Sequence, residues 1–65
     1  MRYNELWRKL YDKVYPEGEA KAVTRMLLTD KYGMTTADML CEEIETFTDA
    51  DTLTADIEAL MAFTP

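Results

Sequence analysis

The apolar residues of the first segment recur with the spacing of an α-helix. A stripe at positions i, i+4, i+7 and i+11 comprises Tyr3, Trp7, Leu10 and Val14, and Leu6 and Tyr11 widen it. The strict alternation of apolar and polar residues that is typical of strands is missing along the chain. A proline disfavours the α conformation in the residue before it, so Pro16 predicts that this helix ends at Tyr15.

A second amphipathic segment follows the turn formed by residues 16–18. Its predicted buried row comprises Ala20, Val23 and Leu27, with Met26 beside the row and Leu28 at its margin. Glu17 and Glu19 at the start of this segment, and Lys31 near its end, suit the helix dipole. Gly33 is placed to adopt the left-handed conformation that closes a helix.

The third predicted helix begins at the clearest capping pattern in the chain. Thr35 can serve as the N-cap, with Asp38 three residues later completing a capping box. Met34 and Met39 flank this cap and can pack together as a hydrophobic staple. The helix is predicted to continue to about Ile44.

Phe47 is expected to pack back on the core, and the capping pattern repeats directly after it, with Thr48 as N-cap and Asp51 at the third position. A fourth helix is predicted to reach about Phe63. Its buried stripe comprises Ala50, Leu53, Ile57, Leu60 and Met61. Four segments with short connections predict an all-α fold, a small bundle of about four short helices forming one domain over residues 1–65.

Charge divides the chain into two parts. Seven basic and five acidic residues leave the first 31 residues near +2, whereas residues 32–65 hold eight acids and no base. Nucleic acids and anionic membrane surfaces are bound through Lys and Arg, so the net charge of −6 argues against both as partners. A basic protein is the partner that this charge favours.

Cysteine and histidine usage limits the chemistry further. Cys41 is the single cysteine and there is no histidine, so neither an internal disulfide nor a zinc site is expected. We expect Cys41 to be a buried small hydrophobe. No signal peptide can be read in the first ten residues, and the longest apolar run, residues 59–63, has five residues, far below the roughly 20 that span a bilayer. A cytoplasmic location is therefore expected.

The acidic residues support no catalytic or metal site. An EF-hand loop starting at Asp49 would place Leu53, Thr54 and Leu60 at its fifth, sixth and twelfth positions, none of which fits. The neighbouring glutamates Glu42, Glu43 and Glu45 diverge if they lie on a helix, so a solvated face is favoured over acid–base catalysis, with protein binding as the remaining alternative.

DNA binding is also disfavoured. A recognition helix brings Arg, Lys, Asn or Gln to base edges, whereas the segment after Gly33 offers acidic residues. Aromatic residues could suggest base stacking, but those of the first helix lie on its apolar stripe. Core packing is therefore favoured for the aromatic residues, with an exposed Tyr15 or Tyr32 at a protein interface as the alternative.

Taken in order, these segments resemble the N-terminal helical domain of the release-factor glutamine methyltransferases of the HemK/PrmC type. The matching segments are Tyr3-Asn-Glu-Leu-Trp7, Glu19–Leu28 closed by Tyr32-Gly33-Met34, Thr35–Leu40, and Phe47–Met61. In that family a Gly-Glu-Pro-x-Gln-Tyr segment then leads into the catalytic domain. Pro65 resembles its proline, with Thr64 where the family has Glu.

The resemblance implies a domain that binds and positions the bacterial peptide chain release factor. Catalysis would reside in a separate domain in cis, which binds S-adenosylmethionine and holds the substrate glutamine with an Asn-Pro-Pro-Tyr motif. No catalytic, cofactor or metal residue is assigned in this chain. The expected partner-contact surface comprises Asp38, Glu42, Glu43 and Glu45. The alternative is a free-standing acidic helical module that binds another protein or self-associates.

Overall fold

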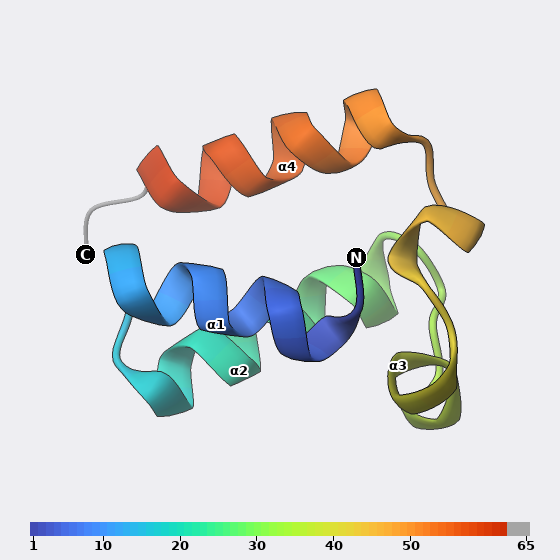
Figure 1. Cartoon of the computed structure of the whole chain (residues 1–65), viewed down its shortest axis with the longest axis horizontal. Helices are drawn as coiled ribbons and strands as arrows, with labels where there is room; N and C mark the ends of the chain where they lie inside the picture. Colours follow the sequence, from blue (N-terminus) through green and yellow to red (C-terminus); the bar gives the residue numbers. More distant parts are fainter. Residues whose placement is uncertain (63–65) are drawn as a thin grey trace.

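The computed structural model describes residues 1–62 and consists of helices joined by short turns (Figure 1). The helices are α1 (Tyr3–Lys13), α2 (Glu17–Asp30), α3 (Thr36–Cys41) and α4 (Ala50–Ala62), with a 3-10 turn, η1 (Ile44–Thr46). No strand occurs among these residues. The predicted all-α bundle of four short helices is confirmed.

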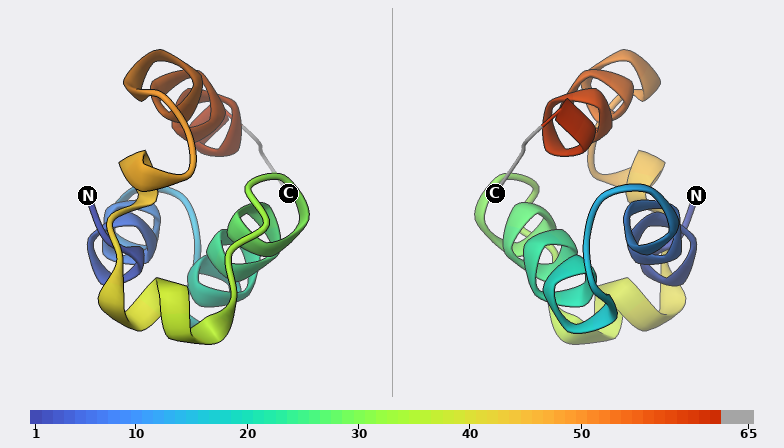
Figure 2. Two further views of the ribbon diagram at one scale, coloured as in Figure 1. Left: turned by 90° about the vertical axis from the view of Figure 1, so that its right-hand side faces the viewer. Right: turned by 90° about the vertical axis from the view of Figure 1, so that its left-hand side faces the viewer.

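α1 and α2 form an antiparallel pair, which is the most extensive contact between two helices in the molecule (Figure 1). The end-on views show α4 lying over this pair on one side, and α3 crossing on the opposite side (Figure 2). Side chains from every helix and from η1 meet in one core. The arrangement makes α1 the helix that faces both α2 and α4.

The core of α1 follows the predicted stripe, with one exception. Tyr3, Leu6, Trp7 and Leu10 are buried, as the helical spacing predicted. Tyr11 was expected to widen this stripe, but its side chain is 47% exposed and tilts against Trp7. Tyr11 lies one helical turn after Trp7, at the edge of the buried stripe, and its ring covers that of Trp7 from the solvent side.

The end of α1 differs from the prediction. The helix stops at Lys13, two residues before the predicted end, and the N–H groups of Val14 and Tyr15 both donate to the Leu10 carbonyl, at 2.9 and 3.0 Å. Tyr15 is buried, and its hydroxyl donates to the Leu60 carbonyl of α4 at 2.9 Å. The alternative prediction of an exposed Tyr15 at a protein interface is therefore wrong, because α1 ends early and the Tyr15 side chain packs under α4.

The buried face of α2 is rotated from the predicted row. Ala20, Thr24 and Leu28, at positions i, i+4 and i+8, are fully buried. Met26, expected beside the buried row, is 64% exposed, whereas Leu28, expected at the margin, lies in the core. A pattern based on apolar residues alone counts Thr24 as polar and therefore misses the row that faces the core.

Thr24 provides a test of this packing, because its buried hydroxyl has no hydrogen-bond partner among the described residues. Replacing Thr24 by Val removes the unsatisfied hydroxyl at nearly constant volume, so we expect the free energy of unfolding to rise by about 1 kcal/mol. Urea denaturation followed by circular dichroism measures this change. Thr24→Ser is the control; it keeps the hydroxyl, loses a methyl group and should be destabilising. A destabilised Val variant would contradict the assignment.

The turn between α2 and α3 is formed as the sequence predicts. Gly33 adopts a φ of 70°, and the Met34 N–H donates to the Leu28 carbonyl at 3.0 Å. The capping box is present: the Asp38 N–H donates to Thr35 Oγ1 at 3.1 Å, and the Thr35 N–H donates to Asp38 Oδ2 at 3.0 Å. Met34 and the predicted staple partner Met39 are both buried in the core.

α3 is shorter than predicted, because it ends at Cys41 and the extended backbone of Glu42 separates it from η1. The Ile44 N–H instead donates to the Met1 carbonyl at 2.8 Å, and this contact ties η1 to the start of the chain. Phe47 packs on the core, as predicted. Cys41 is exposed, so its predicted burial is wrong: the last residue of this short helix faces away from the core.

The cap of α4 lies one residue later than predicted. Asp49, rather than Thr48, precedes the helix, and the Thr52 N–H donates to Asp49 Oδ1 at 2.6 Å. A carboxylate at this position also suits the positive end of the helix dipole. The predicted stripe is confirmed at Leu53 and Ile57, which are buried, and in part at Leu60 and Met61. The predicted Ala50 is exposed, and Phe63 and Pro65 lie outside the described residues.

Candidate functional site

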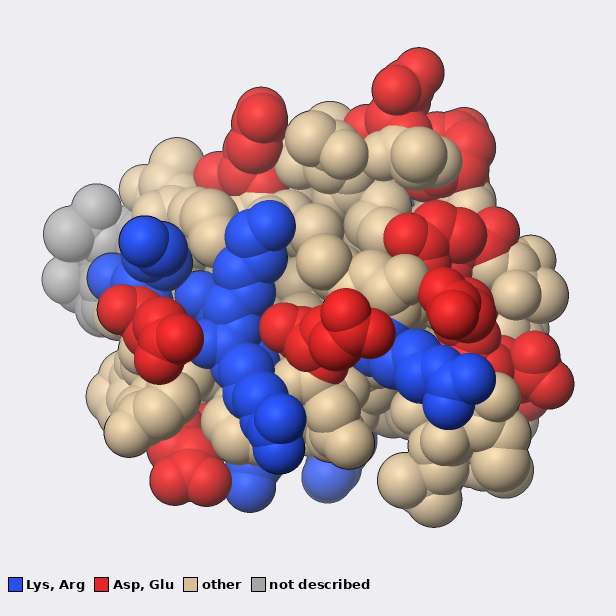
Figure 3. All heavy atoms as spheres, viewed as in Figure 1, with Lys and Arg blue, Asp and Glu red and all other residues tan. Residues whose placement is uncertain are grey.

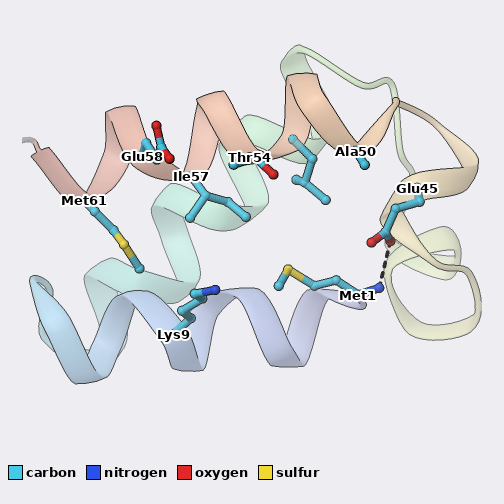
Figure 4. Close-up of a pocket in the computed structure, with 9 residues that line it drawn as sticks. Met1, Lys9, Glu45, Ala50, Thr54, Ile57, Glu58 and Met61 are labelled. Atoms are coloured by element: carbon cyan, nitrogen blue, oxygen red, sulfur yellow. Dashed lines mark hydrogen bonds and ion pairs between the residues drawn. The ribbon is translucent and has the colours of Figure 1, made fainter.

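A half-open groove of about 370 Å³ lies between α1 and α4. Its floor is apolar, since Leu53 and Ile57 are buried core residues of α4. Figure 4 shows Ile57 and Met61 of α4 pointing toward α1, and Lys9 of α1 pointing toward α4. Met1 lies along the same groove, near the end opposite Met61. The groove therefore combines an apolar floor with charged groups at its edges.

Two polar contacts hold α4 in place, in addition to its packing on the core. Tyr15 holds its C-terminal end through the hydrogen bond to Leu60. The end of α2 holds its middle, because Lys31 Nζ lies 2.7 Å from Asp56 Oδ1 and the Tyr32 hydroxyl donates to Asp56 Oδ2. Both anchors come from segments other than α1. The polar contacts that hold α4 therefore come from the segment after α1 and from the end of α2.

Asp56 is the centre of the polar contact between α2 and α4. Its side chain is only 16% exposed. The Lys31 ammonium, and secondly the Tyr32 hydroxyl, hold the pKa of Asp56 below its ordinary value of 3.8. Burial, and secondly the neighbouring Asp56 carboxylate, raise the pKa of Tyr32 above its ordinary value. Tyr32 is partly buried, so the exposed interface tyrosine considered from sequence is not found here either.

A second charged cluster lies at the end of the groove nearest Met1. The Met1 ammonium lies 2.8 Å from Glu43 Oε2 and 2.7 Å from Glu45 Oε1, which also lines the groove (Figure 4). Hydrogen bonds from these two carboxylates raise the pKa of the ammonium from 8.0 to about 10. The same ammonium lowers the pKa of Glu45. Sequence reasoning missed this cluster, because a main-chain amine more than 40 residues away carries no side-chain signal.

The cluster predicts a loss of stability at alkaline pH. The pKa of the Met1 ammonium is higher in the folded chain, so its contribution is complete below about pH 8 and lost as the pH rises through about 10. We expect a loss of about 1 kcal/mol at most, because the carboxylates are exposed and screened by solvent. Urea denaturation between these two pH values measures it. The N-terminally acetylated chain is the control and should lack this component; an identical pH profile in both chains would contradict the assignment.

The four predicted partner-contact residues lie in different local settings. The Asp38 carboxylate is engaged in the cap of α3. Glu42 is exposed directly after that helix. Glu43 and Glu45 are brought together by the Met1 ammonium. Only Glu45 lines the groove.

Acidic side chains dominate the side of the molecule formed by α4 and the α3–η1 segment. In Figure 3, acidic atoms lie over α4 and toward η1, whereas basic atoms gather over α1, with acidic atoms between them. α4 carries Asp51, Asp56 and Glu58 and no base. The groove therefore lies at the boundary between an acidic helix and a face of mixed charge.

Comparison with known proteins gives no further assignment. No protein-family model matches the chain, and neither a curated protein nor a solved structure matches it. The resemblance to the release-factor methyltransferases therefore stays a prediction from sequence. Within residues 1–62, no group of acidic or cysteine side chains is arranged to hold a metal ion, and no helix has the length and apolar character needed to cross a membrane.

Proposed function

We propose that this chain is a protein-recognition domain that binds a basic segment of a partner protein. The observation that carries the proposal is the groove between α1 and α4, in which an apolar floor lies beside an acidic helix. Apolar concave sites with a few charged groups at their edges are typical binding sites. Acidic groups beside such a site favour a basic partner through electrostatic complementarity.

The bacterial peptide chain release factor is the specific partner that we propose. This choice rests on the sequence resemblance to the N-terminal domain of the release-factor glutamine methyltransferases. In this proposal the chain binds and positions the release factor. A catalytic domain in cis supplies S-adenosylmethionine binding and methyl transfer. The alternative, a free-standing acidic module that binds another protein, uses the same groove and the same charge.

Titration of a purified bacterial release factor into the chain tests the proposal. We expect the double variant Glu42→Lys, Glu43→Lys to bind about tenfold more weakly, because two charges that attract a basic partner are reversed. Glu45 remains available to pair with the Met1 ammonium in this variant, and circular dichroism establishes whether the variant is folded. The matched control, Glu17→Lys with Glu19→Lys, reverses two exposed acids at the start of α2.

The outcomes separate the two functions. If the double variant and the native chain bound the release factor with equal affinity, the α3–η1 segment would not be part of the contact surface. Absence of binding by the native chain would reject the release factor as partner of this domain and leave the alternative module. Equal weakening in both charge-reversed variants would show that net charge alone drives the association.

A further inference from the structure

We infer that the groove between α1 and α4 accepts a single apolar side chain presented by a basic amphipathic helix. This inference rests on the proposed function and specifies the chemistry of the partner. The volume of about 370 Å³ lies at the lower end of the range of about 300–1,000 Å³ for ligand pockets. A groove of this size suits one anchor residue rather than a long apolar stripe.

The floor of the groove specifies an apolar anchor. Leu53 and Ile57 are almost fully buried, so each presents a small aliphatic surface to the groove and no hydrogen-bonding side-chain group. Met1 and Met61 lie near opposite ends, partly buried against the core. Methionine side chains are flexible and polarisable, so they can adjust to anchors of different shape. An amphipathic helix that places one apolar residue in a groove is an established mode of peptide recognition.

The edges of the groove specify the charge around the anchor. Glu58 lies on the α4 side and Lys9 on the α1 side, and at one end Glu45 is paired with the Met1 ammonium, so the acidic edge of the groove is α4. Lys or Arg residues flanking the anchor would face the acids of α4 and η1. If the partner helix instead turned its Lys or Arg residues toward α1, Lys9 on that wall would repel them.

A second copy of the chain is a poorer occupant than a basic helix. The chain carries a net charge of −6, and α4, one of the two helices beside the groove, bears acids only among its charged residues. Two such surfaces brought together repel each other. Charge complementarity therefore selects a partner of opposite sign.

A synthetic peptide of leucine and lysine, about 11 residues long and therefore about three helical turns, is the probe. Its leucines lie on one helical face. The control peptide has the same composition with the leucines scrambled, so both carry the same charge. Methyl NMR spectra of the protein report the position of binding. We expect the patterned peptide to shift the methyl resonances of Met1 and Met61, and to leave that of the exposed Met26 on α2 unchanged.

A matched pair of variants tests whether the groove is the site. Ala50 and Ala55 are both exposed on α4, but only Ala50 lines the groove. We expect Ala50→Trp to occupy the groove and weaken binding of the patterned peptide by at least about tenfold, which corresponds to about 1.4 kcal/mol. Ala55→Trp should leave the affinity unchanged. Circular dichroism establishes that both variants are folded.

Each result decides the inference. Selective binding of the patterned peptide, with the expected shifts and variant effects, supports it. Equal binding of both peptides without shifts at Met1 and Met61 would overturn it, while leaving release-factor binding by another surface intact. Failure of both peptides to bind would overturn it as well. Shifts of these two methyl groups that depend on protein concentration, without peptide, would assign the groove to a second copy instead.

Discussion

Truncation of Leu28 to alanine is expected to lower the free energy of unfolding by about 2–5 kcal/mol. Leu28 is fully buried at the contact between α2 and the rest of the core, so the substitution removes core contacts and leaves a cavity. A domain of 65 residues has a total stability of only about 3–10 kcal/mol. Urea denaturation of this variant should therefore show a strongly reduced midpoint, or a chain that is already partly unfolded.

Leu40→Ala is the matched control, because the same substitution then falls on a side chain that is 68% exposed at the end of α3. We expect this variant to stay within about 0.5 kcal/mol of the native chain. Met26→Ala, on the exposed face of α2, should behave like it. If Met26→Ala were the damaging substitution and Leu28→Ala were harmless, α2 would present the face predicted from apolar residues alone.

Local sequence signals predicted the four helices, the turn after α2 and the start of α3. The capping box of Thr35 and Asp38 and the turn at Gly33 act within a few residues, so they can be identified without knowledge of the fold. The same holds for the apolar stripe of α1. The cap of α4 was placed one residue early, because Thr48 and Asp49 are both good caps and only the packed helix selects between them.

Features that depend on distant contacts could not be predicted in this way. Ala20 was correctly predicted to be buried, but the rotation of α2 also depends on Thr24, a polar residue that an apolar pattern does not place in the core. The position of α4 beside the groove depends on the hydrogen bonds of Tyr15 to Leu60 and of Tyr32 to Asp56, which join residues far apart in sequence. The acidic residues of this region were recognised from sequence, but their pairing with the Met1 ammonium requires the folded chain.

The attachment of α4 to the end of α2 gives the second large effect. Asp56→Asn keeps the shape of the side chain but removes its charge, so the bonds from Lys31 and Tyr32 lose their charge-assisted character. We expect the free energy of unfolding to fall by about 1–2 kcal/mol. Lys31 is half exposed and its ion pair alone contributes little; the partly buried Tyr32 hydroxyl accounts for most of the change. Urea denaturation near neutral pH measures it.

The pH dependence separates this charge effect from a general loss of packing. The pKa of Asp56 is lowered in the folded chain, so its contribution is present above about pH 3.8 and is lost as the pH falls through the lower folded value. The difference between the native chain and Asp56→Asn should therefore shrink in acid, although Asp49 and Glu45 keep their own acid dependence in both. Glu58→Gln, an exposed carboxylate on the same helix, should leave stability near neutral pH unchanged. A pH-independent difference for Asp56→Asn would mean that the carboxylate charge does not hold α4, and the groove would then depend on core packing alone.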